Sequence, residues 1–290
     1  MKTEKFIKIL FFSYLYMAIL AEGISQDWLF RVHSVENLSG MPTMSCFSDS
    51  YAGFHFRNDF GMKEMMFADC SGAWHIKKNM LIFSVNHYGY GNYGEMTLSV
   101  GYGRNFGDRF AMTARIFYLM AHARSYPTRH SLCTDFALTY KVSGTLLLTA
   151  TVYNPFMMRY GIVGQEIIPL KFAVGCTYLP VQKLLLSLTT TKMLPGEWEV
   201  DCRFMAQPIP PLLLAVHGSN SRLGIFIGLI YRKFLFSVEA AWYYRVSVSS
   251  QIGGEFYWEE EMRIRRWGDE EMRRRKDERM KRWKDEKRRR

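Results

Sequence analysis

The chain has 290 residues, of which 48% are hydrophobic, 16% aromatic and 22% charged. This composition supplies enough apolar surface for a core, so it excludes an intrinsically disordered protein. The formal net charge is +11, and residues 259–290 carry about half of it, with 15 Lys/Arg against 10 Asp/Glu. After the first 25 residues no apolar run reaches the ~18 to 20 residues of a spanning helix, which excludes a polytopic helical membrane protein.

The first 25 residues have the parts of a secretory signal peptide. Three lysines among the first eight residues precede an apolar segment at 9–20, and small residues follow. Cleavage near Ser25 would leave Gln26 as the mature N-terminus. An uncleaved anchor is the alternative, although the apolar segment is short for a membrane span. We therefore expect an exported protein.

From residue 81 to 257 the sequence repeats one unit, a run of about ten residues that alternates apolar and polar, followed by a turn signal. Two weaker candidate strands, 65–68 and 73–76, precede this region. They would raise the number of strands from twelve to fourteen. The twelve clear strands are 81–88, 95–103, 110–121, 132–141, 145–153, 170–178, 183–189, 198–205, 212–218, 223–231, 234–242 and 246–257.

The apolar face of these strands is continuous and ends in aromatic residues. A transmembrane barrel places such a band toward lipid, with aromatic girdles at its edges. A secreted soluble β-sandwich, with its aromatic face inside, gives the same alternation and is the alternative fold. Export and the length of the strands favour the barrel. The aromatic side chains predicted to face lipid are Phe136, Tyr140, Phe172, Tyr178, Trp198, Phe204, Phe234, Phe236 and Trp242.

The polar face of the predicted strands carries charges of both signs. In a barrel of this size, such charges either pair with one another and fill the interior or line an aqueous path. Glu199, Asp201 and Arg203 lie two residues apart on one strand, which favours pairing. The charged side chains predicted to face the lumen are Arg115, Asp135, Lys141, Lys171, Lys183, Glu199, Asp201, Arg203 and Glu239.

The predicted fold is all-β, an antiparallel transmembrane β-barrel of about 12–14 strands in the cell outer membrane. Residues 1–25 are the signal peptide, 26–62 an N-terminal plug or periplasmic segment, 63–258 the barrel, and 259–290 a charged tail, helical or disordered. Short connections at 105–108 and 142–144 alternate with longer ones at 124–130 and 154–166. With an even strand number, this alternation places both termini at the periplasmic rim.

Several short motifs resemble those of a known family. They are Leu38-Ser-Gly-Met-Pro42, Ser48-Asp-Ser-Tyr-Ala-Gly53, Asn58-Asp-Phe-Gly-Met62, Tyr102-Gly-Arg-Asn-Phe-Gly-Asp108 and Val152-Tyr-Asn-Pro155. Together they resemble the fatty-acid-transporter-like outer-membrane barrels, most of all the Bacteroidetes group that includes barrel components of the type IX secretion system. Asp59-Phe60 stands where this family has Pro-Ala. The resemblance implies the barrel fold over residues 38–256, with transport or secretion as its function.

No motif points to catalysis, a cofactor or a metal. The seven histidines show no HxxxH or HExxH spacing, and no GxSxG, Walker or dinucleotide fingerprint occurs. The five cysteines form no CxxC pair, so they match neither a zinc site nor a dense disulfide framework. Cys46 and Cys70 could pair outside the cytoplasm, or all five could be small apolar residues. We expect a protein that is not an enzyme.

Two functional hypotheses follow. In the first, the barrel is a non-enzymatic accessory or scaffold for protein secretion or surface display, as the type IX resemblance implies. In the second, it is an outer-membrane transport barrel for small hydrophobic solutes. The expected partners are outer-membrane lipid and secretion-system or cell-envelope proteins, and nucleic acid is not expected for an exported chain. The charged tail could contact an acidic partner or anionic lipid.

Overall fold

A computed structural model describes residues 42–47, 49–160, 167–181, 183–244 and 248–258. The predicted signal peptide at 1–25, residues 26–41 and the charged tail at 259–290 lie outside the described residues. Within the described part of the chain, no helix is long and apolar enough to cross a membrane.

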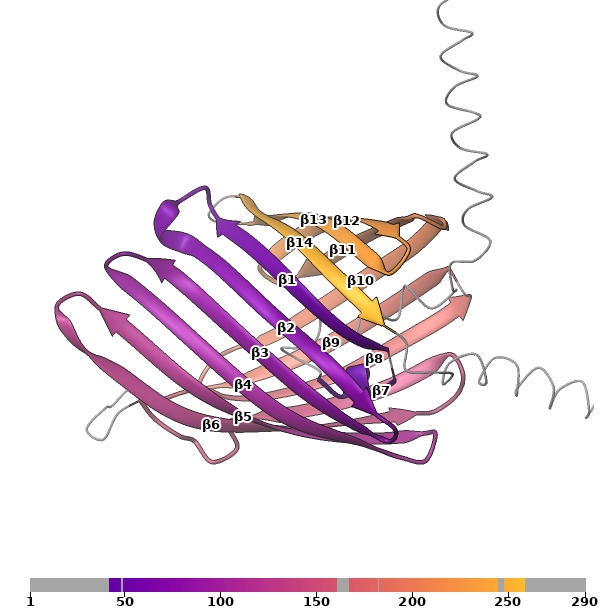
Figure 1. Ribbon diagram of the computed structural model, residues 1–290, viewed down its shortest axis with the longest axis horizontal. Coiled ribbons are helices and arrows are strands. Elements are labelled where there is room, and N and C mark those ends of the chain that lie inside the picture. The colour runs from indigo at the N-terminus through magenta and orange to yellow at the C-terminus, as the bar shows by residue number, and fades with distance from the viewer. Residues whose placement is uncertain (1–41, 48, 161–166, 182, 245–247, 259–290) are drawn as a thin grey trace, which may run out of the picture. The chain divides into compact units, whose positions relative to one another are not determined.

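Fourteen antiparallel strands form a closed barrel (Figure 1), which confirms the predicted fold class. Each strand pairs with its neighbours along the chain, and β1 (Ser50–Asp59) pairs with β14 (Val248–Trp258) to close the sheet. A short 3₁₀ helix, η2 (Pro42–Phe47), precedes β1, and a second, η3 (Lys63–Met65), precedes β2. The other strands are β2 (Met66–Ile76), β3 (Asn79–Tyr90), β4 (Tyr93–Phe106), β5 (Phe110–Ala123), β6 (Tyr126–Lys141), β7 (Leu146–Tyr153), β8 (Leu170–Val181), β9 (Leu184–Leu194), β10 (Trp198–Ile209), β11 (Leu212–Ser219), β12 (Arg222–Tyr231) and β13 (Phe234–Tyr243).

The barrel begins earlier than the sequence analysis predicts, at Ser50 instead of residue 63. The predicted N-terminal segment, 26–62, includes β1, because only Phe54 and Phe56 mark the outward face of this strand and its alternation is weak. The two candidates at 65–68 and 73–76 belong to one strand, β2. The polar run Asp69-Cys70-Ser71 interrupts its apolar pattern, so the strand appears in the sequence as two fragments.

The outward face of the barrel is apolar. Along β10, Trp198, Val200 and Phe204 are exposed, whereas Glu199, Asp201 and Arg203 between them are partly buried. The interpretation as a soluble sandwich is therefore wrong, because a sandwich would bury the aromatic face. Each of the nine aromatic side chains predicted to face lipid is exposed, between 43% and 58%: Phe136, Tyr140, Phe172, Tyr178, Trp198, Phe204, Phe234, Phe236 and Trp242.

The two rims of the barrel differ in their connections. At the rim where β1 begins and β14 ends, called here the terminal rim, every connection has two to four residues. The opposite rim carries the long connection from β7 to β8, as predicted. The expected long loop at 124–130 is wrong, because β6 starts at Tyr126 and only two residues separate it from β5. Short turns at the rim that carries both ends of the strand series are typical of the periplasmic side of an outer-membrane barrel, so we expect the terminal rim to face the periplasm.

Ile116→Arg is expected to lower the free energy of unfolding by about 2–4 kcal/mol, because a charge in the middle of the apolar band must face hydrocarbon. Ile116 is 60% exposed at the centre of β5. Tyr126→Arg is the matched control, since Tyr126 is 68% exposed at the opposite rim, where the cost falls to about 0–1 kcal/mol. Denaturant titration in lipid vesicles measures both. Equal losses would contradict a membrane centred on Ile116.

Candidate functional site

The interior of the barrel is the candidate site. Eight of the nine charged residues predicted for the lumen occupy inward-facing strand positions: Arg115, Asp135, Lys141, Lys171, Glu199, Asp201, Arg203 and Glu239. The ninth, Lys183, is exposed in the turn between β8 and β9, because the hairpin reverses there before the strand begins. The inward face of the wall thus carries charge of both signs.

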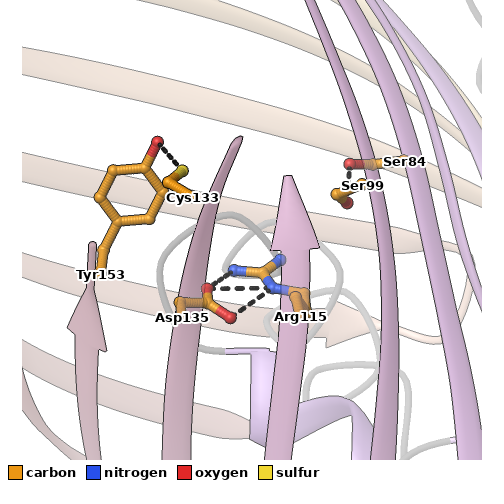
Figure 2. Close-up of polar contacts among 6 residues, drawn as sticks. All are labelled: Ser84, Ser99, Arg115, Cys133, Asp135 and Tyr153. Carbon is orange, nitrogen blue, oxygen red and sulfur yellow. Dashed lines mark hydrogen bonds and ion pairs between the residues drawn. The ribbon is translucent and has the colours of Figure 1, made fainter. Parts of the chain in front are cut away.

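Arg115 and Asp135 form a buried ion pair between β5 and β6, where the register places them directly opposite each other. The side chains point toward one another (Figure 2), and each is 1% exposed. Arg115 Nε donates to both carboxylate oxygens of Asp135, at 3.0 and 3.1 Å, and Nη2 donates a further bond. Bidentate geometry of this kind satisfies both groups when water is excluded. The Arg115 guanidinium also lies 4.9 Å from the ring centroid of Phe117.

A glycine on the neighbouring strand makes room for this ion pair. Gly101 of β4 is paired with Arg115, and a Cβ atom at residue 101 would lie 2.4 Å from Cγ of Arg115. The same arrangement recurs at His217, whose ring would lie 2.2 Å from a Cβ at residue 224. Sequence reasoning missed this signal, a glycine on the inward face opposite a large polar residue.

A second polar cluster joins β1, β2 and β14, and sequence reasoning missed it. His55 Nε2 lies 3.0 Å from Oε1 of Glu255, and its Nδ1 lies 3.5 Å from Oδ2 of Asp69. Tyr257 donates a hydrogen bond to the other oxygen of Glu255, and Ser71 donates one to Asp69 at 2.9 Å. These residues belong to the first two strands and the last, so the cluster connects the strands that close the barrel.

The third polar cluster lies on β10 to β13. His217 is 1% exposed, and its Nε2 lies 3.4 Å from Oε1 of Glu239. Arg203 and Asp201 occupy neighbouring inward positions of β10, and Arg203 pairs directly with His217 in the strand register. Each of the three clusters therefore brings acidic and basic side chains together on the inner wall, and the three are called together the charged layer. Among the described residues, no group of three or more side chains is arranged to hold a metal ion.

An apolar layer occupies the lumen on the terminal-rim side of the charged layer. Its strand members each lie within six residues of a strand end at that rim, and most are fully buried. Packing of this density keeps these side chains out of contact with water. The buried members are Cys46 of η2 with Tyr51, Ala73, Met80, Ile82, Ala111, Leu185, Met205, Leu213, Ala215, Phe226, Ile230, Leu235 and Tyr257.

The N-terminal helix η2 lies inside the barrel as part of this layer, in contact with β4, β5 and β6. Thr139 donates a hydrogen bond to Thr43 at 2.8 Å, and the Asn105 side chain donates one to the Cys46 carbonyl at 2.9 Å. A Cβ at residue 103 would lie 3.0 Å from Sγ of Cys46, so the absence of a side chain at Gly103 leaves room for the helix to pack against the wall. Part of the predicted 26–62 segment is thus seated in the bore.

The long connection between β7 and β8 packs against the inner wall beside β7, which is a short strand of eight residues. Asn154 is fully buried and donates to the carbonyl of Ile168 at 2.8 Å, and Ser131 of β6 donates to the carbonyl of Arg159 at 2.7 Å. Ile168 packs with Phe117 on the inner wall. Nearby, Cys133 donates to the Tyr153 hydroxyl at 3.1 Å (Figure 2). The described part of this loop therefore contributes to the lumen.

All five cysteines are unpaired, which decides between the two alternatives for them. Cys46 is buried within the lumen, whereas Cys70 is exposed on the outward face of β2, so the wall separates the two thiols. Burial raises the pKa of the Cys46 thiol to about 12. The cysteines serve as small apolar residues.

Cys46 is therefore expected to resist a water-soluble maleimide at pH 8 in the folded barrel, because the thiol is protonated and shielded. The same chain unfolded in guanidinium should react fully at this position. Mass spectrometry of peptides containing Cys46 measures both states. Rapid labelling of the folded protein would show that η2 leaves the bore without any ligand.

Comparison with solved structures finds outer-membrane channels of the same fold. The monoaromatic hydrocarbon channel CymD has a TM-score of 0.61 with this chain at 8% identity, over 78% of this chain and 94% of CymD. The Pseudomonas putida toluene transporter TodX has a TM-score of 0.58 at 7% identity, over 77% and 94% of the two chains. No protein-family model matches the chain, and no curated protein matches it. This likeness, the closed barrel and its apolar outer face identify an outer-membrane β-barrel.

Proposed function

We propose that this barrel is a non-enzymatic outer-membrane channel for small hydrophobic solutes. The observation that carries the proposal is the apolar layer in the lumen, which includes a short N-terminal helix that no disulfide fixes to the wall. A hydrocarbon that enters this layer exchanges water for apolar side chains, which is favourable in proportion to the area buried. The fold likeness to CymD, a monoaromatic hydrocarbon channel, and to the toluene transporter TodX supports the same solute class.

Helix η2 is the movable part in this proposal. The structure shows two hydrogen bonds between this helix and the wall, through Thr43 and Cys46, and it places the Lys141 ammonium 5.2 Å from the ring centroid of Phe47. A solute that competes for the apolar contacts of Cys46 and Phe47 would displace the helix. The path then opens toward the periplasm, because η2 lies at the terminal rim.

The test is entry of radiolabelled toluene into cells that express the barrel, with η2 either free or locked. Thr43→Cys/Thr139→Cys supplies the lock, since the two hydroxyl oxygens are 2.8 Å apart and both residues are fully buried. The oxidised variant should lose transport and regain it after reduction with dithiothreitol. If the parent barrel admits toluene no faster than the oxidised variant, the channel proposal fails.

The secretion-scaffold hypothesis has one observation in its favour, the pairing of charges between neighbouring strands along the inner wall. A barrel that transports nothing can fill its interior with such pairs. Here Arg115 pairs with Asp135, and His55 pairs with Glu255. A scaffold would bind its partners through its rims and leave toluene entry independent of the η2 lock. The same experiment therefore separates the two functions.

A further inference from the structure

The terminal rim carries exposed basic side chains on four of its six turns. Among the described residues of these turns, Asp108 is the one exposed acidic side chain. The basic residues are Lys77 and Lys78 between β2 and β3, Arg109 between β4 and β5, Lys183 between β8 and β9, and Arg232 and Lys233 between β12 and β13.

Among the opposite-rim residues whose side chains the structure describes, there is no such excess. There, exposed Glu64 and Glu197 balance exposed Arg124 and Arg159. The positive charge of the terminal rim is therefore a property of that rim, and it does not follow from the net charge of the chain.

These basic groups lie beside the aromatic residues at the edge of the outward apolar band. Trp74 is 50% exposed three residues before Lys77, and Tyr231 is 62% exposed directly before Arg232. The Arg232 guanidinium lies 5.5 Å from the ring centroid of Tyr231, so the charge is held at the level of the ring. Interfacial aromatic rings lie at the depth of lipid headgroups, which places these cations among the phosphates.

We propose that the terminal rim binds the phosphate groups of anionic phospholipids in the periplasmic leaflet. The turns that carry the charge are distributed along the closed strand order, from β2–β3 to β12–β13, so the positive groups form an interrupted ring. A ring of this kind fits the annulus of lipids around a barrel. An acidic globular partner would approach from one side and reach only some of the turns.

The experiment measures lipid selectivity of the full-length barrel in phosphatidylcholine vesicles by electron paramagnetic resonance of spin-labelled lipids. The parent should prefer phosphatidylglycerol over phosphatidylcholine, by up to about fivefold for a lipid that contacts one basic side chain. In 1 M salt the Debye length is about 3 Å, and the preference for phosphatidylglycerol should fall toward onefold.

The terminal-rim variant is Lys77→Asn/Lys78→Gln/Arg232→Asn/Lys233→Gln, and it should lose this preference. Asn is used where φ is positive, 58° at Lys77 and 55° at Arg232, because it tolerates that conformation.

The matched control is Arg124→Gln/Arg159→Gln at the opposite rim, which should keep the preference of the parent. Soluble glycerophosphate at millimolar concentration should also leave it unchanged, since the ring binds headgroups only within a membrane. The proposal is overturned if the terminal-rim variant retains the preference, if the control variant loses it, or if glycerophosphate abolishes it. That last result would indicate a discrete site for free phosphate.

Discussion

Asp135→Ala is expected to lower the free energy of unfolding by about 3–5 kcal/mol, because it removes the carboxylate from a guanidinium that is 1% exposed. The free-energy cost of transferring Arg115 from water to this interior is compensated by the hydrogen bonds that its Nε and Nη2 donate to Asp135. Guanidinium titration of the barrel in vesicles measures the loss. A cost below about 1 kcal/mol, typical of an exposed pair, would show that water reaches Arg115.

The double variant Arg115→Met/Asp135→Leu provides the control. Exchanging both partners for apolar side chains of similar volume is expected to be neutral or stabilising by about 1–4 kcal/mol, since no charge is left buried. A large loss in the double variant as well would assign the effect of Asp135→Ala to packing instead of charge. The two titrations together separate the electrostatic from the steric contribution.

Replacing Pro42–Phe47 with a Gly-Ser linker of equal length is expected to change a closed bore into a conducting one. The helix supplies Cys46 and Phe47 to the apolar layer, and without them the layer is incomplete beside β4, β5 and β6. Single-channel recording in planar bilayers should show discrete steps for the linker variant and none for the parent. A silent linker variant would mean that the strand side chains close the bore unaided.

Phe156→Ala/Met157→Ala is a control for that measurement. Both side chains belong to the long β7–β8 connection and are exposed, at 66% and 58%, and Phe156 packs against the outward-facing Phe136. Truncating them should leave conductance at the level of the parent. Conductance equal to that of the linker variant would show that any disturbance of the barrel opens it.

The alternation of apolar and polar residues predicted the strands best where one face is uniformly apolar. β12 is such a case, with Leu223, Ile225, Ile227 and Leu229 exposed along one face. The sequence does not predict β1, because the structure of this strand depends on its position in the barrel. Tyr51 is fully buried in the apolar layer, and the inward face of β1 mixes small, aromatic and charged residues. Propensity is a weak guide when a strand has no uniform face.

Alternation along a strand indicates the face on which a residue of the candidate site lies, but it does not indicate the partner of that residue. The period of two assigned Arg115 and Asp135 to the lumen, yet their pairing depends on a register that the turn between β5 and β6 determines. His55 and Glu255 are 200 residues apart, so their contact follows only from closure of the barrel. For helix η2 the sequence does not distinguish a plug from a segment at the periplasmic rim, because six residues without a hydrophobic period carry no signal of the surface they bind.

The pairing of β1 with β14 also bears on how the protein is made. Ser50 lies opposite Trp258 in this ladder, so the first strand to be synthesised must wait for the last before its second edge is paired. During export β1 presents an open edge of backbone donors and acceptors, the kind of surface on which strands of other chains associate. Contacts of such long sequence separation also form slowly, because loop closure precedes any gain in energy. Biogenesis, more than the finished barrel, is thus the stage at which this chain is most exposed to aggregation.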